Sequence, residues 1–238
     1  MDVNIQTQPD DETCGPTSLQ AVYRYYHDNI SLDQVISEVQ RLRNGGTLAC
    51  LLGKHAMGRG YEAKLYVYNL DIFDPSWFDH RGNAVPDIIE KLILQSRYST
   101  AKSFLETTDA YIQYLKAGGK LFYKELSTDL LKSYFTQKKP IITGLSATYL
   151  YQTPRERQTS KGKMIYDDIR GEPCGHFVVL CGYDEKYRHI VVADPHRTNP
   201  ISNNNYYKVS IKRLMNAIML GVLTFDANLL VITPKGQS

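Results

Sequence analysis

The chain has 238 residues, enough for one large domain with a sizeable core, and its 42% hydrophobic and 22% charged content is ordinary for a soluble globular protein. Its 28 basic and 25 acidic residues are scattered and leave a net charge of only +3, which gives no support for nucleic-acid binding. No apolar run approaches the roughly 18 residues of a membrane span, and the N-terminus lacks the charged and apolar regions of a signal peptide. We therefore expect a cytoplasmic protein without a membrane span, unless a leader has been removed.

The first part of the chain is predicted to be mainly helical. One helix begins near Cys14, and a second follows a capping box formed by Ser31 and Gln34. A third helix is expected over residues 48–57, with Thr47 as its cap, and a strand over residues 64–69. Residues 66–125 are less transparent and are interpreted as an insertion or subdomain of a single domain that spans residues 1–238. Their expected elements are helices over 86–94 and 111–115 and a short strand over 120–125.

The second part of the chain is richer in strands. A helix capped by Ser127 is expected to run to Gln137, followed by a buried strand over 140–145. Residues 152–174 form a long polar segment that we predict to be a functional or mobile loop. Two further strands are predicted over 175–183 and 190–195. This order of helices first and strands later favours the α+β class.

Cys14 is placed where a reactive thiol would be expected. The segment after it has helical periodicity, Thr13 is a candidate cap, and Pro16 suits a first helical turn. The unpaired N–H groups and dipole at a helix start favour a thiolate, which is the reactive form of cysteine. The alternative is a small buried hydrophobic residue, the usual fate of a free cysteine. Because acidic residues at positions 10–12 disfavour a thiolate, a nucleophilic Cys14 needs a basic partner.

His176 and Asp194 are predicted to be that partner and its acid. They lie on the two strands of an expected hairpin, 18 positions apart. With an odd-length loop centred on Glu185, Val179 faces Val191 and the two polar residues stand directly opposite on one face. An even loop would offset them unless a bulge at Gly182 compensated. An acid beside the imidazole would hold its tautomer and stabilise its charged form.

Other residues are weaker candidates for these roles. His55, His189 and His196 lie on a helix, in a turn and in a loop, and Asp184 is at the far end of the hairpin from His176. Both key residues also have structural interpretations, His176 as a hydrogen-bonded strand residue and Asp194 as the start of an Asp-Pro turn. A metal site is disfavoured because no closely spaced ligand pair is present, and no cofactor is indicated. The four cysteines, at positions 14, 50, 174 and 181, form no C-x-x-C pair, and a Cys14–Cys174 disulfide remains open.

These motifs carry a family resemblance. The run Gln8-x5-Cys14-Gly15-Pro16, the later Gly175-His176-Phe177-Val178-Val179 and Asp194-Pro195 resemble the peptidase C39-like family of the papain-like cysteine peptidase group. The resemblance covers the beginning of the chain and residues 127–196. It implies a papain-like α+β fold, in which an N-terminal helical half bearing the cysteine packs against a C-terminal antiparallel sheet bearing His and Asp.

The resemblance also implies a role for each site residue. Cys14 would be the nucleophile, His176 the general base and acid, and Asp194 the orienting residue, while Gln8 and the Cys14 N–H would bind the oxyanion. The implied function is a cysteine peptidase acting on a peptide or protein substrate through an acyl-enzyme, without metal or cofactor. Two alternatives remain: acyl transfer at the same site, as in a transpeptidase or amidase, and a catalytically silent peptide-binding module.

Overall fold

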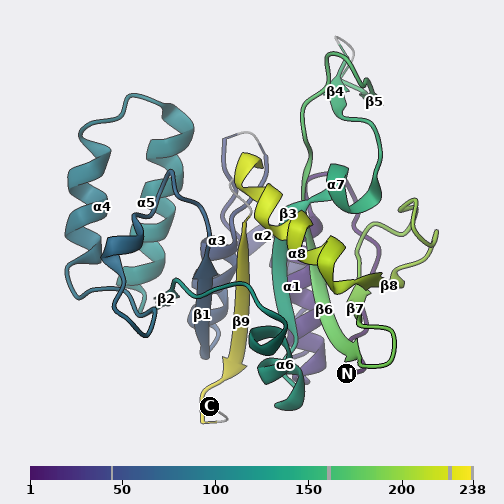
Figure 1. The fold of residues 1–238 in the computed structure, drawn as a ribbon, viewed down its shortest axis with the longest axis horizontal. Helices are drawn as coiled ribbons and strands as arrows, with labels where there is room; N and C mark the ends of the chain where they lie inside the picture. Colours follow the sequence, from purple (N-terminus) through teal and green to yellow (C-terminus); the bar gives the residue numbers. More distant parts are fainter. Residues whose placement is uncertain (44, 160–161, 225–226, 237–238) are drawn as a thin grey trace.

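The structure is a computed structural model that describes residues 1–43, 45–159, 162–224 and 227–236. A seven-stranded sheet forms its centre, and Figure 1 shows helices on both faces of it. The spatial order of the strands is β2 (Lys120–Phe122), β1 (Tyr61–Val67), β9 (Asn228–Pro234), β3 (Ile141–Ser146), β6 (Gly175–Asp184), β7 (His189–Ala193) and β8 (Tyr206–Ser210). All neighbours are antiparallel except β1 and β2, which are parallel. The predicted α+β class is therefore confirmed.

One face of the sheet is covered by the helices of the first half of the chain. These are α1 (Cys14–Tyr25), α2 (Leu32–Glu38) and α3 (Ala49–Gly58), while α5 (Lys102–Lys116) packs against α3 and α4 (Ile88–Ser96) packs against α5. On β6, Phe177, Val179 and Cys181 point into the core beneath these helices. The helix that bears Cys14 thus packs on the strand that bears His176, as the resemblance implied.

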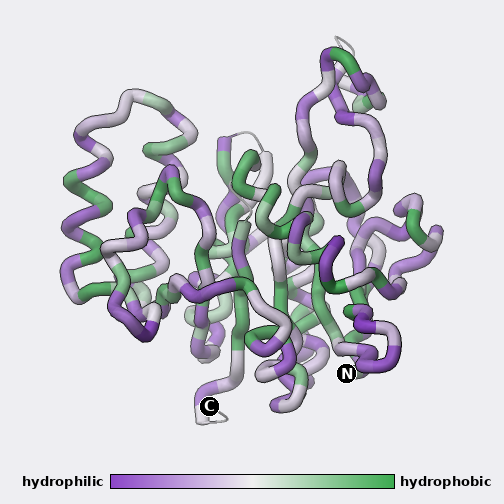
Figure 2. The backbone as a smooth tube through the Cα atoms, in the orientation of Figure 1, coloured by the Kyte–Doolittle hydropathy of each residue, from purple (hydrophilic) through white to green (hydrophobic). Residues whose placement is uncertain are grey.

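The opposite face has a second core. It is covered by α6 (Thr128–Thr136), α7 (Ala147–Tyr151), α8 (Ile211–Leu220) and the short 3-10 helix η2 (Gly221–Thr224). Val178 and Leu180 of β6 point into it, alternating with the residues of the first core. Figure 2 shows the result: hydrophobic residues predominate along the central strands, and hydrophilic residues are frequent in the connections around them.

The hairpin of β6 and β7 differs in register from the prediction. Its loop, residues 185–188, has four residues rather than an odd number, and Val179 pairs with Ala193 instead of Val191. A register shift between Leu180 and Gly182 restores the parity, so the even loop with a bulge is the arrangement present. His176 and Asp194 are consequently diagonal neighbours on one face rather than directly opposite.

Residues 66–125 contain η1 (Pro75–Trp77), α4, α5 and β2. Figure 1 places α4 and α5 beyond the β2 edge of the sheet. Tyr114 of α5 ties this segment to the sheet, because its hydroxyl donates to the carbonyls of Ala63 (3.0 Å) and Lys120 (3.1 Å). The interpretation of the segment as an insertion stays a prediction.

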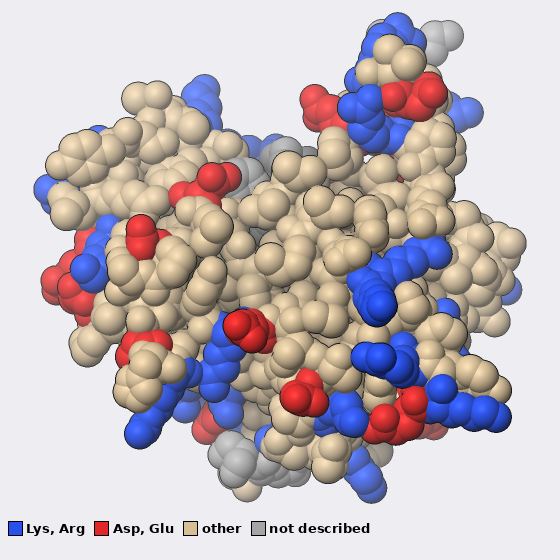
Figure 3. Space-filling view, viewed as in Figure 1, with Lys and Arg blue, Asp and Glu red and all other residues tan. Residues whose placement is uncertain are grey.

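The long polar segment after α7 is not wholly irregular. It contains a small antiparallel pair, β4 (Glu156–Gln158) and β5 (Met164–Tyr166), which projects from the body of the molecule in Figure 1. We call residues 152–174 the arm. Its side chains include charges of both signs, visible at the top right of Figure 3. Asp167 organises the base of the arm by accepting hydrogen bonds from Arg157 (2.7 Å) and Arg170 (2.9 Å).

Most predicted helix boundaries are close to those observed. The hydroxyls of Ser31 and Ser127 accept hydrogen bonds from Gln34 N and Leu130 N, which confirms both caps. The expected cap at Thr47 is wrong, because α3 starts two residues later after Leu48. Thr47 instead donates its hydroxyl to the Gln40 carbonyl at 3.0 Å.

Candidate active site

Cys14 is the first residue of α1 and is half-buried. The structure does not show the expected side-chain cap from Thr13, whose hydroxyl donates to the Asp10 carbonyl at 3.2 Å. The start of α1 is fixed by its contact with β6, since the Ser18 hydroxyl donates to the Phe177 carbonyl at 3.2 Å. This contact holds the thiol next to the first residues of β6.

The structure brings Cys14, His176 and Asp194 together. Nε2 of His176 lies 2.8 Å from Oδ1 of Asp194. The thiol of Cys14 lies near the same imidazole and contributes to the raised pKa of His176. Because Asp194 occupies Nε2, Nδ1 is the ring nitrogen that remains for the thiol. Three residues separated by up to 180 positions thus form one connected chain of polar groups.

Asp194 is the most constrained member of this chain. It has no exposed surface, and four donors surround its carboxylate. Oδ1 accepts from His176 and from the backbone N–H of His196 (2.8 Å), while Oδ2 accepts from the hydroxyls of Tyr151 and Tyr207 (2.7 Å each). The sequence did not single out either tyrosine, because nothing in spacing distinguishes them among 18 tyrosines.

The pKa values of the pair move in opposite directions. Burial lowers the pKa of His176, but the Asp194 charge, its hydrogen bond and the Cys14 thiol outweigh burial and raise that pKa to about 10. Burial raises the pKa of Asp194, but the His176 charge and the hydrogen bonds from His176 and the two tyrosines hold it below its usual range. Both shifts favour an imidazolium paired with a carboxylate.

Gln8 lies at the edge of this group but is held by local contacts. Its backbone N–H donates to the Pro195 carbonyl (3.0 Å), which places it beside Asp194, and its Nε2 donates to the Asp10 carbonyl (2.7 Å). That carbonyl fixes the orientation of the amide, because a flipped amide would set two acceptors against each other. Nε2 carries a second N–H, and Oε1 is buried with no hydrogen-bond partner among the described residues.

The alternative acids and bases have other partners. His55 bonds the Tyr23 hydroxyl (2.8 Å) and Glu38 (3.0 Å), and Asp184 pairs with Lys208 (2.9 Å). His196 bonds the Thr198 hydroxyl (3.0 Å) and also lies near the site, with its ring centroid 6.2 Å from that of His176. Burial and the His176 charge lower the pKa of His196, so it is expected to be neutral near neutral pH.

Two adjoining cavities flank the reactive groups. The first, which we call the Cys14 groove, has a volume of about 730 Å³ and is bordered by Cys14, Phe177 and the base of the arm. The second, the His176 pocket, has a volume of about 280 Å³ and is bordered by Gln8, His176 and Tyr151. Asp11, Glu156, Met164, Cys174 and Gly175 line both cavities. A substrate could therefore lie across the thiol and the imidazole at once.

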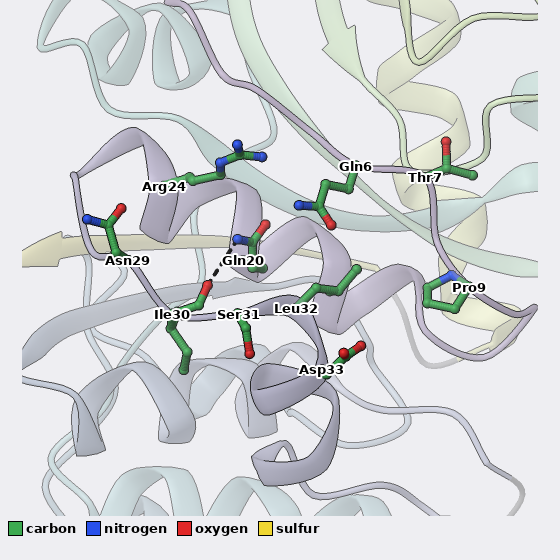
Figure 4. Close-up of a pocket in the computed structure, with 10 residues that line it drawn as sticks. All are labelled: Gln6, Thr7, Pro9, Gln20, Arg24, Asn29, Ile30, Ser31, Leu32 and Asp33. Carbon is green, nitrogen blue, oxygen red and sulfur yellow. Dashed lines mark hydrogen bonds between the residues drawn. The ribbon is translucent and has the colours of Figure 1, made fainter.

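A third cavity, of about 670 Å³, lies between the N-terminal segment, α1 and α2. Figure 4 shows its polar walls, with Gln20 donating to the Ile30 carbonyl at 3.1 Å. Its lining contains no cysteine or histidine, so it does not offer the same chemistry.

Neither a metal cluster nor a disulfide is found in the part of the chain that the structure describes. No group of three or more His, Cys, Asp or Glu side chains there could hold a metal ion. Cys14 and Cys174 are both thiols, so the disulfide left open by the sequence is not present. Of the helices described, none is both long and apolar enough to cross a membrane.

Comparison with known proteins decides the family. The Peptidase_C39 like family matches residues 1–216. The chain belongs to the Peptidase_C39 like family. As a member of this family it is an enzyme, a cysteine peptidase. The comparison with curated proteins gave no match.

The fold is similar to that of a solved C39-like peptidase structure. A putative C39-like peptidase from Bacillus anthracis has a TM-score of 0.51 and 14% identity, over 98% of this chain and 94% of that one. A double glycine motif protease from an AMS/PCAT transporter, in complex with its leader peptide, has a TM-score of 0.45 and 18% identity over 98% and 93%. The peptidase domain of Streptococcus ComA, a bi-functional ABC transporter, has a TM-score of 0.43 and 13% identity over 98% and 99%.

Proposed function

We propose that this C39-like peptidase hydrolyses a peptide bond through an acyl-enzyme on Cys14. The observation that carries the proposal is the connected group of Cys14, His176 and the fully buried Asp194. A structural histidine would not need a thiol on one nitrogen and a four-donor carboxylate on the other. The three groups instead have the order of nucleophile, base and orienting acid.

The proposed reaction has two halves. The Cys14 thiolate attacks the substrate carbonyl carbon, and imidazolium His176 gives its proton to the leaving amine as the C–N bond breaks. Water then attacks the thioester, His176 accepts a proton from that water, and the C–S bond breaks to release the acid and the thiolate. Asp194 holds the imidazole through Nε2 in both halves, so Nδ1 faces the reacting atoms.

The oxyanion formed in each half needs donors. The backbone N–H of Cys14 is in the first turn of α1, where N–H groups have no intrahelical acceptor. Gln8 is the proposed second donor, through the N–H of Nε2 that is not directed at Asp10. Removal of one such donor typically slows an acyl-transfer reaction by about 10² to 10³.

A peptide-library digest tests the proposal. Wild-type protein is expected to release new amino termini, and Cys14→Ala is expected to release none, because the variant lacks the proposed nucleophile. Cys50→Ala is the control, since that thiol is buried in the core and distant from the two cavities. Transfer of the acyl group to an added amine would indicate the transpeptidase alternative. Silence of the wild type on all peptides would indicate the binding module and contradict the proposal.

The proposed substrate is a peptide or protein segment that lies across the Cys14 groove and the His176 pocket. We propose this broad class of substrate and no particular sequence. A cytoplasmic location and the absence of nucleic-acid partners stay predictions from the sequence.

A further inference from the structure

The His176 pocket has an unusual balance of charge. Its carboxylic acids and histidines are Asp11, Glu156, His176 and His196, and its lining contains neither lysine nor arginine. The imidazolium of His176 is offset by Asp194, and the lowered pKa of His196 keeps that ring neutral. The two carboxylates thus share only the charge of His176, which Asp194 already holds, in a cavity of about 280 Å³.

These two carboxylates come from opposite walls. Asp11 belongs to the loop before α1, and Glu156 is the first residue of β4 in the arm. Glu156 is half-buried, and its pKa is raised first by burial and then by the Asp11 charge. The charge of His176 and the Cys174 thiol act in the opposite direction and lower that pKa, but burial and Asp11 outweigh them. The two acids thus repel each other across the place where the groove and the pocket meet.

Two arginines of the arm are already paired with a different carboxylate. Arg157 and Arg170 both form ion pairs with Asp167. Among the ion pairs of the described residues, none involves Asp11 or Glu156. Of the two arginines that flank Glu156, Arg157 is paired with Asp167, and Arg155 donates to the backbone carbonyls of Asp168 and Ile169.

Two uncharged groups of the pocket also suit a positive charge. Oε1 of Gln8 is an acceptor with no partner among the described residues. The side chain of Tyr166, at the end of β5, is 56% exposed and lines the same cavity, so its ring face is accessible to a cation. Carboxylates, an amide oxygen and an aromatic face are the groups that bind ammonium and guanidinium ions.

We propose that the His176 pocket binds a lysine or arginine side chain of the peptide substrate and that Glu156, with Asp11, selects for it. The proposal rests on the proposed peptidase function and specifies its substrate. A cation in the pocket would relieve the repulsion between the two acids and would lie beside the reacting bond. Glu156 is therefore a specificity-determining residue on the arm.

The test uses fluorogenic peptides, acetylated at the N-terminus so that only side chains carry positive charge. Each position on both sides of the cleaved bond carries in turn lysine, norleucine or glutamate. At one position we expect lysine to exceed norleucine in kcat/KM by about five- to tenfold, as for one partly exposed ion pair, and glutamate to be the poorest. Glu156→Gln and Asp11→Asn should each lower this lysine-to-norleucine ratio towards one, and 1 M salt should reduce it in the wild type.

Asp168→Asn is the matched control, because Asp168 is an exposed acid of the same arm that lines none of the three cavities. It should leave the ratio unchanged. Equal cleavage of lysine and norleucine peptides at every position would overturn the inference while leaving the peptidase function intact. A lysine preference that survives both Glu156→Gln and Asp11→Asn would overturn it as well. Failure of the wild type to cleave any peptide would instead contradict the proposed function.

Discussion

Asp194 shows how a single buried residue shapes this site. A carboxylate without exposed surface is expensive to bury unless its oxygens are fully hydrogen-bonded. Four donors meet that need, and two of them are the hydroxyls of Tyr151 and Tyr207. Tyr151 precedes His176 in the sequence, and Tyr207 follows it. The acid can therefore stay ionised and hold the imidazolium in place.

Loss of one of these hydroxyls should be costly. Tyr207→Phe keeps the ring but leaves Oδ2 of Asp194 with one donor fewer, so we expect the free energy of unfolding to fall by about 2 kcal/mol. Denaturant unfolding measures the change. Tyr187→Phe, at a position 60% exposed, is the control and should be neutral. Equal stability of the two variants would show that the tyrosine contact is dispensable.

The raised pKa of His176 predicts a pH dependence of stability. A group that titrates near 6.5 when unfolded and near 10 when folded stabilises the fold fully below pH 6.5, and that contribution disappears as the pH rises towards 10. The difference in unfolding free energy between wild type and His176→Gln should therefore shrink from pH 6.5 to pH 10. Denaturant titrations at several pH values measure it. A constant difference across this range would contradict the charged pair.

At the scale of elements, the contact of α1 with its surroundings sets the position of the thiol. Gly15 is in the first turn, and a Cβ there would lie 2.6 Å from Thr47 Cγ2 and 3.3 Å from the Phe177 ring. Thr47 cannot easily retreat, because it is buried, β-branched and hydrogen-bonded to Gln40. The Gly15 position therefore admits only a residue without a side chain if α1 is to stay where it is.

Gly15→Ala should consequently disturb both stability and catalysis. Overpacking of this kind costs about 1–3 kcal/mol, and a displaced α1 would move Cys14 away from His176. Gly58→Ala is the matched control, since a Cβ at the end of α3 meets nothing within 4 Å. Thermal unfolding and kcat/KM report the two effects. Normal activity in Gly15→Ala would contradict the close-packed position of the thiol.

The sequence predicted these elements better than their pairing. Caps at Ser31 and Ser127 were visible because their partners are three residues away. The predicted register of β6 and β7 was wrong, because loop length and bulge position depend on how both strands pack. The requirement that His176 and Asp194 share a face is met both by an odd loop and by an even loop with a bulge. His176 and Asp194 still meet, because an even loop and one bulge restore the shared face.

For the whole molecule, the C-terminal segment completes the sheet. β9 lies between β1 and β3 and pairs with both, so it joins the strand of the first half of the chain to the strands that bear His176. The sequence did not indicate this, because a strand inserted between two earlier strands leaves no local signal. The sequence did not indicate Tyr207 on β8 either, because its hydroxyl reaches Asp194 only when β7 and β8 pair.

Removal of β9 should therefore disrupt the whole fold. A chain ending at Thr224 would leave β1 and β3 without their shared neighbour and would remove residues 229–232, whose buried side chains contribute to both cores. We expect it to lose cooperative thermal unfolding, whereas a chain ending at Gly236, which keeps β9, should unfold as the full chain does. Differential scanning calorimetry distinguishes the two. A cooperative transition in the shorter chain would show that β9 is peripheral.

The most direct test of the account is the reactivity of Cys14 itself. Iodoacetamide labelling from pH 5 to 9, mapped by mass spectrometry, compares Cys14 with Cys174. Cys174 is a suitable reference because it is also half-buried and also lines the Cys14 groove. If His176 holds Cys14 as a thiolate, Cys14 should label faster than Cys174 at pH 6, and His176→Ala should remove that advantage. Labelling of Cys14 at pH 6 no faster than Cys174, or unchanged in His176→Ala, would contradict the proposed catalytic pair.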